Sequence, residues 1–465
     1  MRFGIAELYF HELAAGVGYL RRRWVDFVDW EKEYKQKLVS VEAAAAFIKS
    51  NDRICSATVA SIPTDLLIAI GKRWTELENV TIISQIALYP FDFFKKEYKG
   101  HIKYHVMFMG ALERKYYPEG NMDITSYNFS RSDWLVKNRM KANVFVSEVS
   151  PPDENGNMSL GPLGGMFGKI ASEYADTVIL QVNKKTPYVY GAETSFINIR
   201  DVDYICESDR DLAVLPQPPV AEEETKIASH IIPYIEDGST IQIGLGGVAN
   251  AVGFFLEDHK DLGVHTEMLT DSLVHLAEKG VINGSKKSIH KGEMIIAFGL
   301  GSRKLYDFMH KNERVKSYPV YYVNDPYVIG KNKKFVSINS CLACDLTGQV
   351  GSESIGFHQF SCTGGQLDFV RGASLAEDGK SFLCMNSTAR KKDGTVVSKI
   401  TASLPPGTVV TTPRTDVHYV VTEYGVADLR ERSIAERVKA LVNIAHPDFR
   451  DELARQAREY GIIFA

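Results

Sequence analysis

The chain has 465 residues, an apolar content of 45% and a formal net charge of −4 from 54 basic and 58 acidic side chains. This length exceeds what one hydrophobic core usually spans, so we expect two or more domains. The balanced charge, without long runs of one sign, excludes bulk binding to nucleic acid, and no apolar run is long enough to cross a membrane.

The cysteines and the N-terminal residues bear on location. Six cysteines in a chain this long do not form a disulfide framework, which favours a reducing, cytoplasmic setting. Cys341 and Cys344 form a lone Cys-x-x-Cys without a second pair at zinc spacing, so we expect no metal site. Residues 1–28 carry their arginines after the apolar stretch, unlike a secretory signal, and are interpreted as an N-terminal extension of unknown role.

A faint internal repeat organises the rest of the chain. Residues 47–54 resemble residues 234–241, and each segment ends a helix and enters a strand, followed by a turn, a helical stretch and a second strand. The Pro-rich and then acidic segment 215–224 is the best linker. The sequence therefore predicts two related α/β domains, at 29–218 and 219–465.

Further elements follow from apolar and β-branched runs, which alternate with helical patterning that begins at 32–50. Such interleaving predicts mostly parallel or mixed sheets with covering helices. Strands are expected at 80–84, 177–182, 294–298, 320–323, 335–339, 382–385, 409–412 and 419–422, and helices at 63–77 and 250–259.

A glycine loop follows the strand of the second repeat, where the first repeat has Ala57-Thr58-Val59-Ala60. Its residues are Gly244, Leu245, Gly246, Gly247 and Val248. Such a loop presents N–H groups at a helix start, which suits a phosphate, a carboxylate or a developing oxyanion. With Ala249 the loop also satisfies the dinucleotide fingerprint, and a turn that only lets strand and helix pack is the plain alternative.

Glu267 lies about twenty residues after this loop and is the candidate catalytic residue. It is open to three interpretations: an acid that binds a ribose, a nucleophile that faces an anion site, or a residue that caps the next helix. Because the following residues open a helix, we expect the carboxylate at a strand-to-helix turn. His265 lies on the same strand face, and a buried, hydrogen-bonded imidazole is favoured over a His–Glu pair.

Two later segments, 348–354 and 364–369, concentrate glycines and side-chain amides, as loops that line sites often do, although plain turns between strands have the same composition. Lys392, in Arg390-Lys391-Lys392, has two interpretations. It could neutralise a phosphate, or it could be an exposed residue of a hairpin turn.

Together, segments 241–252, 263–268, 348–354, 364–369 and 420–429 resemble the acetyl-CoA hydrolase/transferase family, which includes 4-hydroxybutyrate, acetate and butyrate CoA-transferases. The resemblance is strong over 237–462, looser over about 30–204, and does not cover the residues before Asp29. It implies a pair of CoA-transferase-type α/β domains with the active site between them, commonly in a homodimer.

By this resemblance Glu267 matches the nucleophile, and residues 244–248 contact the CoA or acyl-carrying end. Leu342, Gly365 and Lys392 match further CoA contacts. We therefore expect a transferase that moves CoA from a short-chain acyl-CoA to a carboxylic acid through a glutamyl-CoA thioester on Glu267. No permanently bound cofactor is expected, since CoA is a substrate. The alternatives are an acyl-CoA hydrolase and a dinucleotide-dependent dehydrogenase.

Overall fold

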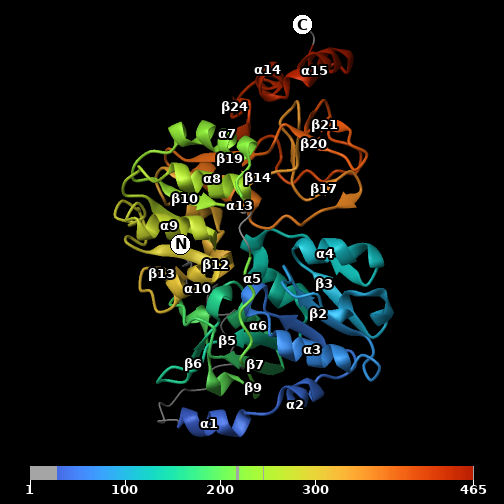
Figure 1. Cartoon of the computed structure of the whole chain (residues 1–465), viewed down its shortest axis with the longest axis vertical. Coiled ribbons are helices and arrows are strands. Elements are labelled where there is room, and N and C mark those ends of the chain that lie inside the picture. Colours follow the sequence, from blue (N-terminus) through green and yellow to red (C-terminus); the bar gives the residue numbers. More distant parts are fainter. Residues whose placement is uncertain (1–28, 216–218, 245, 464–465) are drawn as a thin grey trace, which may run out of the picture.

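The computed structural model describes residues 29–215, 219–244 and 246–463. The extension expected at residues 1–28 lies outside the described residues. Figure 1 shows two α/β halves stacked along the long axis, a first half (29–215) coloured blue to green and a second half (219–463) coloured green to red. The expected fold class, two related α/β units with mostly parallel sheets and covering helices, is confirmed.

The first half contains a seven-stranded sheet in the order β4-β3-β2-β1-β5-β7-β9, with every neighbouring pair parallel. Its strands are mostly buried apolar runs, as a parallel sheet covered on both faces requires. The strands are β1 (Arg53–Ser56), β2 (Val80–Ser84), β3 (Ile102–Val106), β4 (Met122–Ile124), β5 (Val144–Val149), β7 (Thr177–Asn183) and β9 (Tyr204–Ser208). The α-helices are α1 (Trp30–Lys37), α2 (Val41–Ala46), α3 (Thr64–Lys72), α4 (Ala111–Tyr116), α5 (Ser132–Leu135) and α6 (Gly168–Tyr174), and β6 (Asn157–Ser159) pairs with β8 (Phe196–Asn198) outside the sheet.

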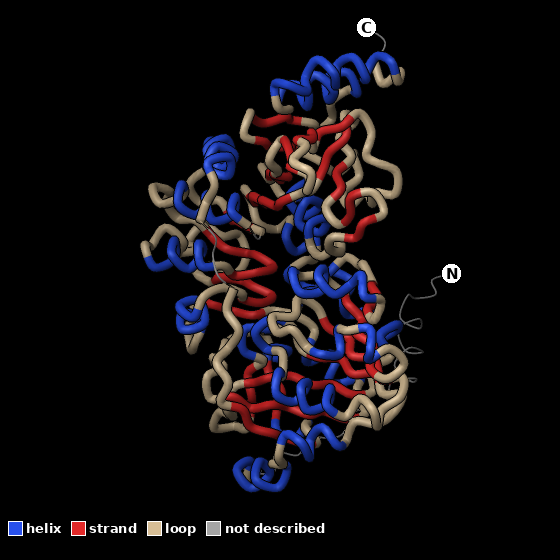
Figure 2. Tube along the Cα trace, turned by 45° about the vertical axis from the view of Figure 1, so that its right-hand side comes forward, coloured by secondary structure: helices blue, strands red, loops and turns tan. Residues whose placement is uncertain are grey.

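The second half repeats this order as β13-β12-β11-β10-β14-β19-β23 and adds one antiparallel edge strand, β24. Figure 2 shows its strands in red as a stack beside the covering helices. The strands are β10 (Thr240–Ile243), β11 (Gly263–Leu269), β12 (Met294–Gly299), β13 (Val315–Ser317), β14 (Phe335–Ser340), β19 (Lys380–Cys384), β23 (Tyr419–Thr422) and β24 (Gly425–Asp428).

Helices and a small β lobe complete the second half. The lobe, at the upper right of Figure 1, consists of short strands that lie outside the main sheet. The helices are α7 (Glu222–Ile231), α8 (Gly247–Phe255), α9 (Asp271–Glu278), α10 (Arg303–Met309), α11 (Val320–Val323), α12 (Pro326–Ile329), α13 (Gln366–Leu375), α14 (Ile434–Ile444) and α15 (Pro447–Glu459). The lobe strands are β15 (Ala343–Asp345), β16 (Val350–Gly351), β17 (Ser354–Ile355), β18 (His358–Gln359), β20 (Thr388–Arg390), β21 (Val396–Ser398) and β22 (Ile400–Thr401).

The backbone supports the internal repeat at two aligned positions. Asn51 and Gly238, which align in the two copies, both adopt positive φ, at 73° and 78°. Asn tolerates this left-handed conformation better than most residues with a side chain. Val59 and Gly246 also align, and both have positive φ, at 49° and 118°. The two copies therefore share a left-handed residue at this position, although Val59 begins a 3-10 turn and Gly246 caps an α-helix.

The carboxyl ends of the two sheets meet at the junction between the halves. Isolated parallel bridges join Asn128, which follows β4, to Gly364, and Gly191, which follows β7, to Ser317 at the end of β13. In open sheets of this kind, ligands bind outside the carboxyl ends of the strands, where the strand order reverses. In the second half the order reverses between β10 and β14. We therefore expect a ligand-binding site at the junction between the halves.

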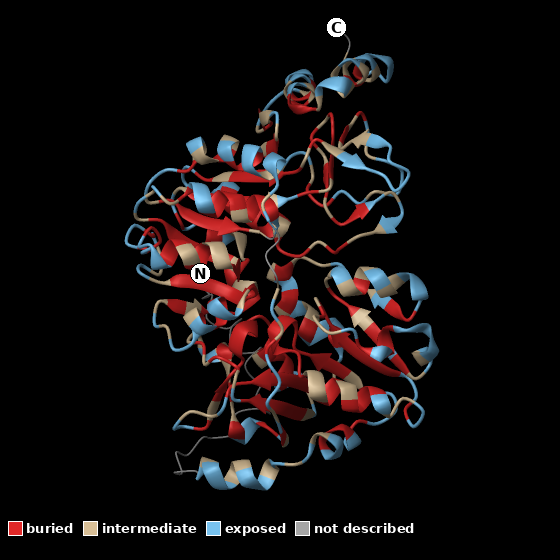
Figure 3. Cartoon of the chain, in the orientation of Figure 1, coloured by how far each residue is buried: buried red, intermediate tan, exposed pale blue. Residues whose placement is uncertain are grey.

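One hydrophobic cluster crosses the junction, with Phe129 and Met166 from the first half and Met268, Phe298 and Phe369 from the second. Figure 3 shows buried residues continuing from one half into the other. The halves therefore share part of their core, which fixes the relative position of residues on either side.

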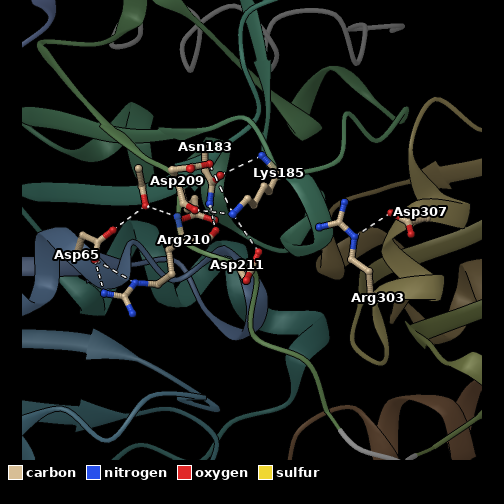
Figure 4. Close-up of polar contacts among 10 residues, drawn as sticks. Asp65, Asn183, Lys185, Asp209, Arg210, Asp211, Arg303 and Asp307 are labelled. Carbon is tan, nitrogen blue, oxygen red and sulfur yellow. Dashed lines mark hydrogen bonds and ion pairs between the residues drawn. The ribbon is translucent and has the colours of Figure 1, made fainter.

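The connection between the halves is held against the first sheet (Figure 4). The Arg210 guanidinium donates to the Asp65 carboxylate, with an Nε–Oδ1 distance of 2.9 Å, and Lys185 Nζ lies 3.0 Å from Asp211. Across the gap in the same view, Arg303 pairs with Asp307 on its own helix at 2.8 Å. Because these groups are largely exposed, their ion pairs contribute little energy and mainly fix the course of the chain.

Three expected elements are wrong. Residues 320–323 form helix α11, because Pro319 precedes a turn in which Tyr322 and Val323 both donate to its carbonyl oxygen. Residues 409–412 are not a strand, since they lie between prolines and pair only through the bridge from Thr412 to Val350. The single helical pattern at 32–50 is two helices, α1 and α2, separated at Leu38 and Val39.

Candidate active site

Glu267 lies within β11, two residues before the strand ends at Leu269, while the next helix begins only at Asp271. The expectation that it stands on the strand-to-helix turn is therefore wrong by a few residues. Its neighbours along the strand are buried, whereas Glu267 itself is partly buried. The strand fixes its backbone and directs its carboxylate out of the sheet towards α11 and α13.

Two groups meet the Glu267 carboxylate. The side-chain amide of Asn324, at the C-terminal end of α11, donates to Glu267 Oε2 with an Nδ2–Oε2 distance of 2.6 Å. Gly365, the N-cap residue of α13, lies so close that a Cβ atom there would overlap both the carboxylate and the Asn324 amide. The first N–H groups of a helix have no intrahelical acceptor, so the start of α13 presents donors beside the carboxylate.

Burial and a second acid raise the pKa of Glu267. Burial raises it to about 7, with a smaller contribution from the negative charge of Asp368, against which the hydrogen bond from Asn324 acts. Asp368, in the first turn of α13, is itself buried and has its pKa raised to about 6, chiefly by burial. The pKa of Tyr127, from the first half, is raised well above the ordinary value, mainly by burial and in smaller part by the charges of Glu267 and Asp368. A carboxylate in these surroundings is poorly hydrated, which makes it a better nucleophile than one in water.

The glycine loop follows β10, the strand that pairs with β11. The parallel register pairs Thr240 with Gly263 and Ile241 with Val264, so Gly244 and Glu267 both lie towards the carboxyl ends of two adjacent strands. Gly246 has a φ of 118° and caps α8, a backbone shape that favours glycine. Gly247 has no room for a side chain because the Glu224 carboxylate occupies that space.

The remaining predicted site residues lie at different depths. Val248 is buried in α8, and Leu245 lies outside the described residues. Leu342 follows β14, is partly buried, and its N–H donates to the Gly351 carbonyl oxygen at 2.9 Å. Lys392 is exposed at the turn between β20 and β21. Its contact with CoA stays a prediction.

His265 and the cysteines take no part in this arrangement. His265 is fully buried, and its Nε2 atom lies 2.8 Å from the Val323 carbonyl oxygen, in line with the favoured hydrogen-bonded imidazole. Cys341 and Cys344 are buried free thiols, and the described residues contain no group of His, Cys, Asp and Glu side chains suited to a metal ion.

A cavity of about 550 Å³ opens at the junction, next to the turn that carries Gly365. Its wall contains Thr363 and Leu367, which flank that glycine, together with the carboxylates of Asp123 and Glu353. Lysine and arginine do not occur among the residues that line it within the described chain. The remaining wall residues are Tyr117, Ile124, Ser126, Asn128, Gln359, Val409, Val410 and Thr411. Such a wall suits an uncharged chain that carries hydrogen-bonding groups better than it suits a phosphate.

Sequence reasoning missed four residues in or next to this arrangement: Tyr127, Ser130, Asn324 and Asp368. Asp368 stood inside a segment already singled out, 364–369, but nothing in the sequence set it apart from an ordinary acid in a first helical turn. Asn324 followed a run that was expected to be a strand. Tyr127 and Ser130 come from the first half, and only the docking of the two halves brings them to the site.

The fold and the site define an α/β protein with two matched parallel sheets and a desolvated acid between them. A related strand order serves dinucleotide-binding proteins. Here the Glu267 carboxylate accepts from Asn324 and lies against Gly365 at the start of α13.

Comparisons with known proteins agree with this class. Residues 22–216 match the model of the acetyl-CoA hydrolase/transferase N-terminal domain, and residues 301–457 match that of the C-terminal domain. A 4-hydroxybutyrate coenzyme A transferase of Clostridium kluyveri is 40% identical over 93% of this chain and 100% of its own length. A butyryl-CoA:acetate CoA-transferase of Anaerostipes caccae is 37% identical over 94% of this chain and 99% of its own length.

Solved structures show the same likeness. The crystal structure of RipA from Yersinia pestis has a TM-score of 0.88 and 34% identity, covering 94% of this chain and 100% of that chain. The chain belongs to the acetyl-CoA hydrolase/transferase family. Relatives named acetyl-CoA hydrolase are more distant, such as that of Candida albicans, which is 25% identical over 66% of this chain and 64% of its own length.

Proposed function

We propose that this protein is an acyl-CoA:carboxylate CoA-transferase that acts on short-chain acids through a glutamyl-CoA thioester on Glu267. The observation that carries the proposal is a desolvated carboxylate that accepts from the Asn324 amide and lies against Gly365 at the N-terminus of α13. The named activities of the most similar relatives support the choice of CoA and short acids.

The chemistry follows from these groups. The Glu267 carboxylate attacks the carbonyl carbon of the acyl thioester and releases CoA as a thiolate, which leaves a mixed anhydride. The thiolate then attacks the Glu267 carbonyl carbon, which releases the first acid and forms the glutamyl-CoA thioester. A second acid repeats the two steps in reverse and leaves as the new acyl-CoA.

Donors near Glu267 are suited to the negative charge that develops at each step. The Asn324 amide donates to the carboxylate, and Gly365, the N-cap residue of α13, lies against it. Removing one donor from an oxyanion site typically costs about 3 kcal/mol of transition-state stabilisation. The cavity beside Thr363 and Leu367 suits the uncharged acyl or pantetheine portion, since its carboxylates would repel the phosphates of CoA.

A trapping experiment tests the proposal. Incubation with butyryl-CoA followed by borohydride should reduce the thioester at Glu267, and peptide mass spectrometry should locate the modified residue. Glu267→Gln provides the matched negative control. An unmodified Glu267 in a preparation that is turning over substrate would contradict the mechanism.

Acyl-CoA hydrolysis is the second candidate, because the family also contains relatives named acetyl-CoA hydrolase. In that reaction water takes the place of the acceptor acid. Release of CoA from butyryl-CoA at the same rate with and without added acetate would favour the hydrolase.

We further propose a homodimer in the cytoplasm. Within the described residues, no helix is both long and apolar enough to cross a membrane.

A further inference from the structure

Asp368 is a buried acid for which the steps above give no role. It belongs to the second half, in the first turn of α13, yet its carboxylate is bonded by the first half. Ser130 donates to it twice, from its backbone N–H to Oδ2 at 2.9 Å and from its hydroxyl to Oδ1 at 2.6 Å. Ser130 lies in the short 3-10 turn Phe129–Arg131, next to the bridge between Asn128 and Gly364.

Asn324 links this acid to the nucleophile. Its side-chain amide donates to Glu267 Oε2, and it lies near enough to Asp368 to lower the pKa of that acid. Two carboxylates on one side leave the amide only one favourable orientation, with Nδ2 towards both acids. Asn324 Oδ1 is buried and has no hydrogen-bond partner within the described chain, so no other contact there fixes the orientation of this amide.

We propose that Asp368 is a positioning residue, which orients Asn324 against Glu267 and makes that orientation depend on the docking of Ser130 from the first half. The inference rests on the proposed function, since it assigns Glu267 as the nucleophile. The negative charge of Asp368 also raises the pKa of Glu267. Asp368 therefore acts on both the geometry and the ionisation of the nucleophile.

The charged and titratable groups around the pair are few. From the first half, Tyr127 has its pKa raised in part by the negative charges of both acids. Arg371, one turn later on α13, lowers the pKa of Asp368 slightly and pairs with Asp416 at 3.2 Å. His265, on the strand of Glu267, has its pKa lowered to about 3 by burial and is neutral at working pH. Asp368 is therefore the negative charge whose removal changes the titration of Glu267 most.

The test combines steady-state kinetics with a pH profile of kcat/KM. Asp368→Asn keeps the shape of the side chain but removes its charge and lets residue 368 donate to Asn324. We expect kcat to fall at least tenfold, and the midpoint of the acid limb to move about one pH unit towards acid, the order of shift that a nearby like charge produces. Asp368→Glu, which restores the charge, should return the midpoint towards that of the wild type.

Glu423→Gln is a matched control, since Glu423 also accepts from the N–H and hydroxyl of one serine, Ser387, at 2.8 and 2.6 Å. It lies after β23, well removed from β11 in the sheet order, and should leave the midpoint unchanged. A wild-type kcat and midpoint in Asp368→Asn would overturn the proposal. If that variant does not fold, Ser130→Ala decides: a severalfold loss of kcat at constant KM supports the proposal, and wild-type kinetics refute it.

The two proposals fail in different ways. Absence of a trapped thioester at Glu267 in the wild type removes the proposed function and this inference with it. A trapped thioester at Glu267, together with wild-type kinetics in both variants at Asp368 and Ser130, removes only the role of Asp368.

Discussion

The surroundings of Glu267 predict that this residue lowers the stability of the folded protein at neutral pH. Its pKa rises from the ordinary value of 4.5 to about 7 on folding. Between these two pH values the unfolded chain loses its proton while the folded protein keeps it, so the free energy of unfolding falls as pH rises. One pKa unit corresponds to about 1.4 kcal/mol, and after discounting for the partial exposure of Glu267 we expect a cost of about 1 to 3 kcal/mol at pH 8.

Glu267→Gln removes this cost because glutamine has nearly the same shape, can still accept from Asn324 and carries no charge. The variant should therefore be inactive and, at pH 8, more stable than the wild type, while the difference should shrink towards zero as pH falls to about 4.5. Differential scanning calorimetry or urea unfolding at several pH values measures it. Glu423→Gln serves as a control for replacing a hydrogen-bonded carboxylate away from the site.

Two outcomes would refute this reasoning. The first is a variant whose stability follows that of the wild type at every pH from 5 to 8, which would mean that folding does not desolvate the carboxylate. The second is a variant less stable than the wild type at pH 8, which would mean that the charged form of Glu267 is better satisfied in the folded protein than in water.

Further predictions concern single residues. Gly365→Ala should leave the fold intact but reduce kcat by orders of magnitude in an acyl-transfer assay, because the added Cβ would displace the Glu267 carboxylate. Lys392→Ala should raise the KM for acyl-CoA and leave kcat nearly unchanged, since the residue is exposed and the proposed contact is with CoA alone. Gly238→Ala should destabilise the protein by about 1 kcal/mol in urea unfolding because of its positive φ, whereas Asn51→Gly should be nearly neutral.

Local patterns in the sequence predicted most of the central strands, because a buried parallel strand is a short apolar run whatever surrounds it. They failed where neighbouring residues overrode the pattern. Val320 to Val323 have the composition of a strand, but Pro319 starts a helical turn there. Residues 409–412 are equally β-rich, yet the flanking prolines leave them without a sheet partner beyond one bridge.

The site was predictable only in part for a related reason. Glu267 and Gly365 belong to motifs that resemble a known family, and the structure places them in contact. Ser130 and Tyr127 carry no local signal, because their importance comes from contacts with residues more than a hundred positions away. A single sequence gives no measure of such distant pairings.

The meeting of two sheets at their carboxyl ends has a consequence for how such a protein can diversify. The second half supplies the reactive acid on a strand, whereas one part of the cavity wall comes from the first half, from β4 and the residues on either side of it between Tyr117 and Asn128. Changing that segment would alter the shape of the substrate that is accepted while leaving the reactive strand unaltered. Selection for new acids can therefore act on one side of the interface without compromising the chemistry on the other.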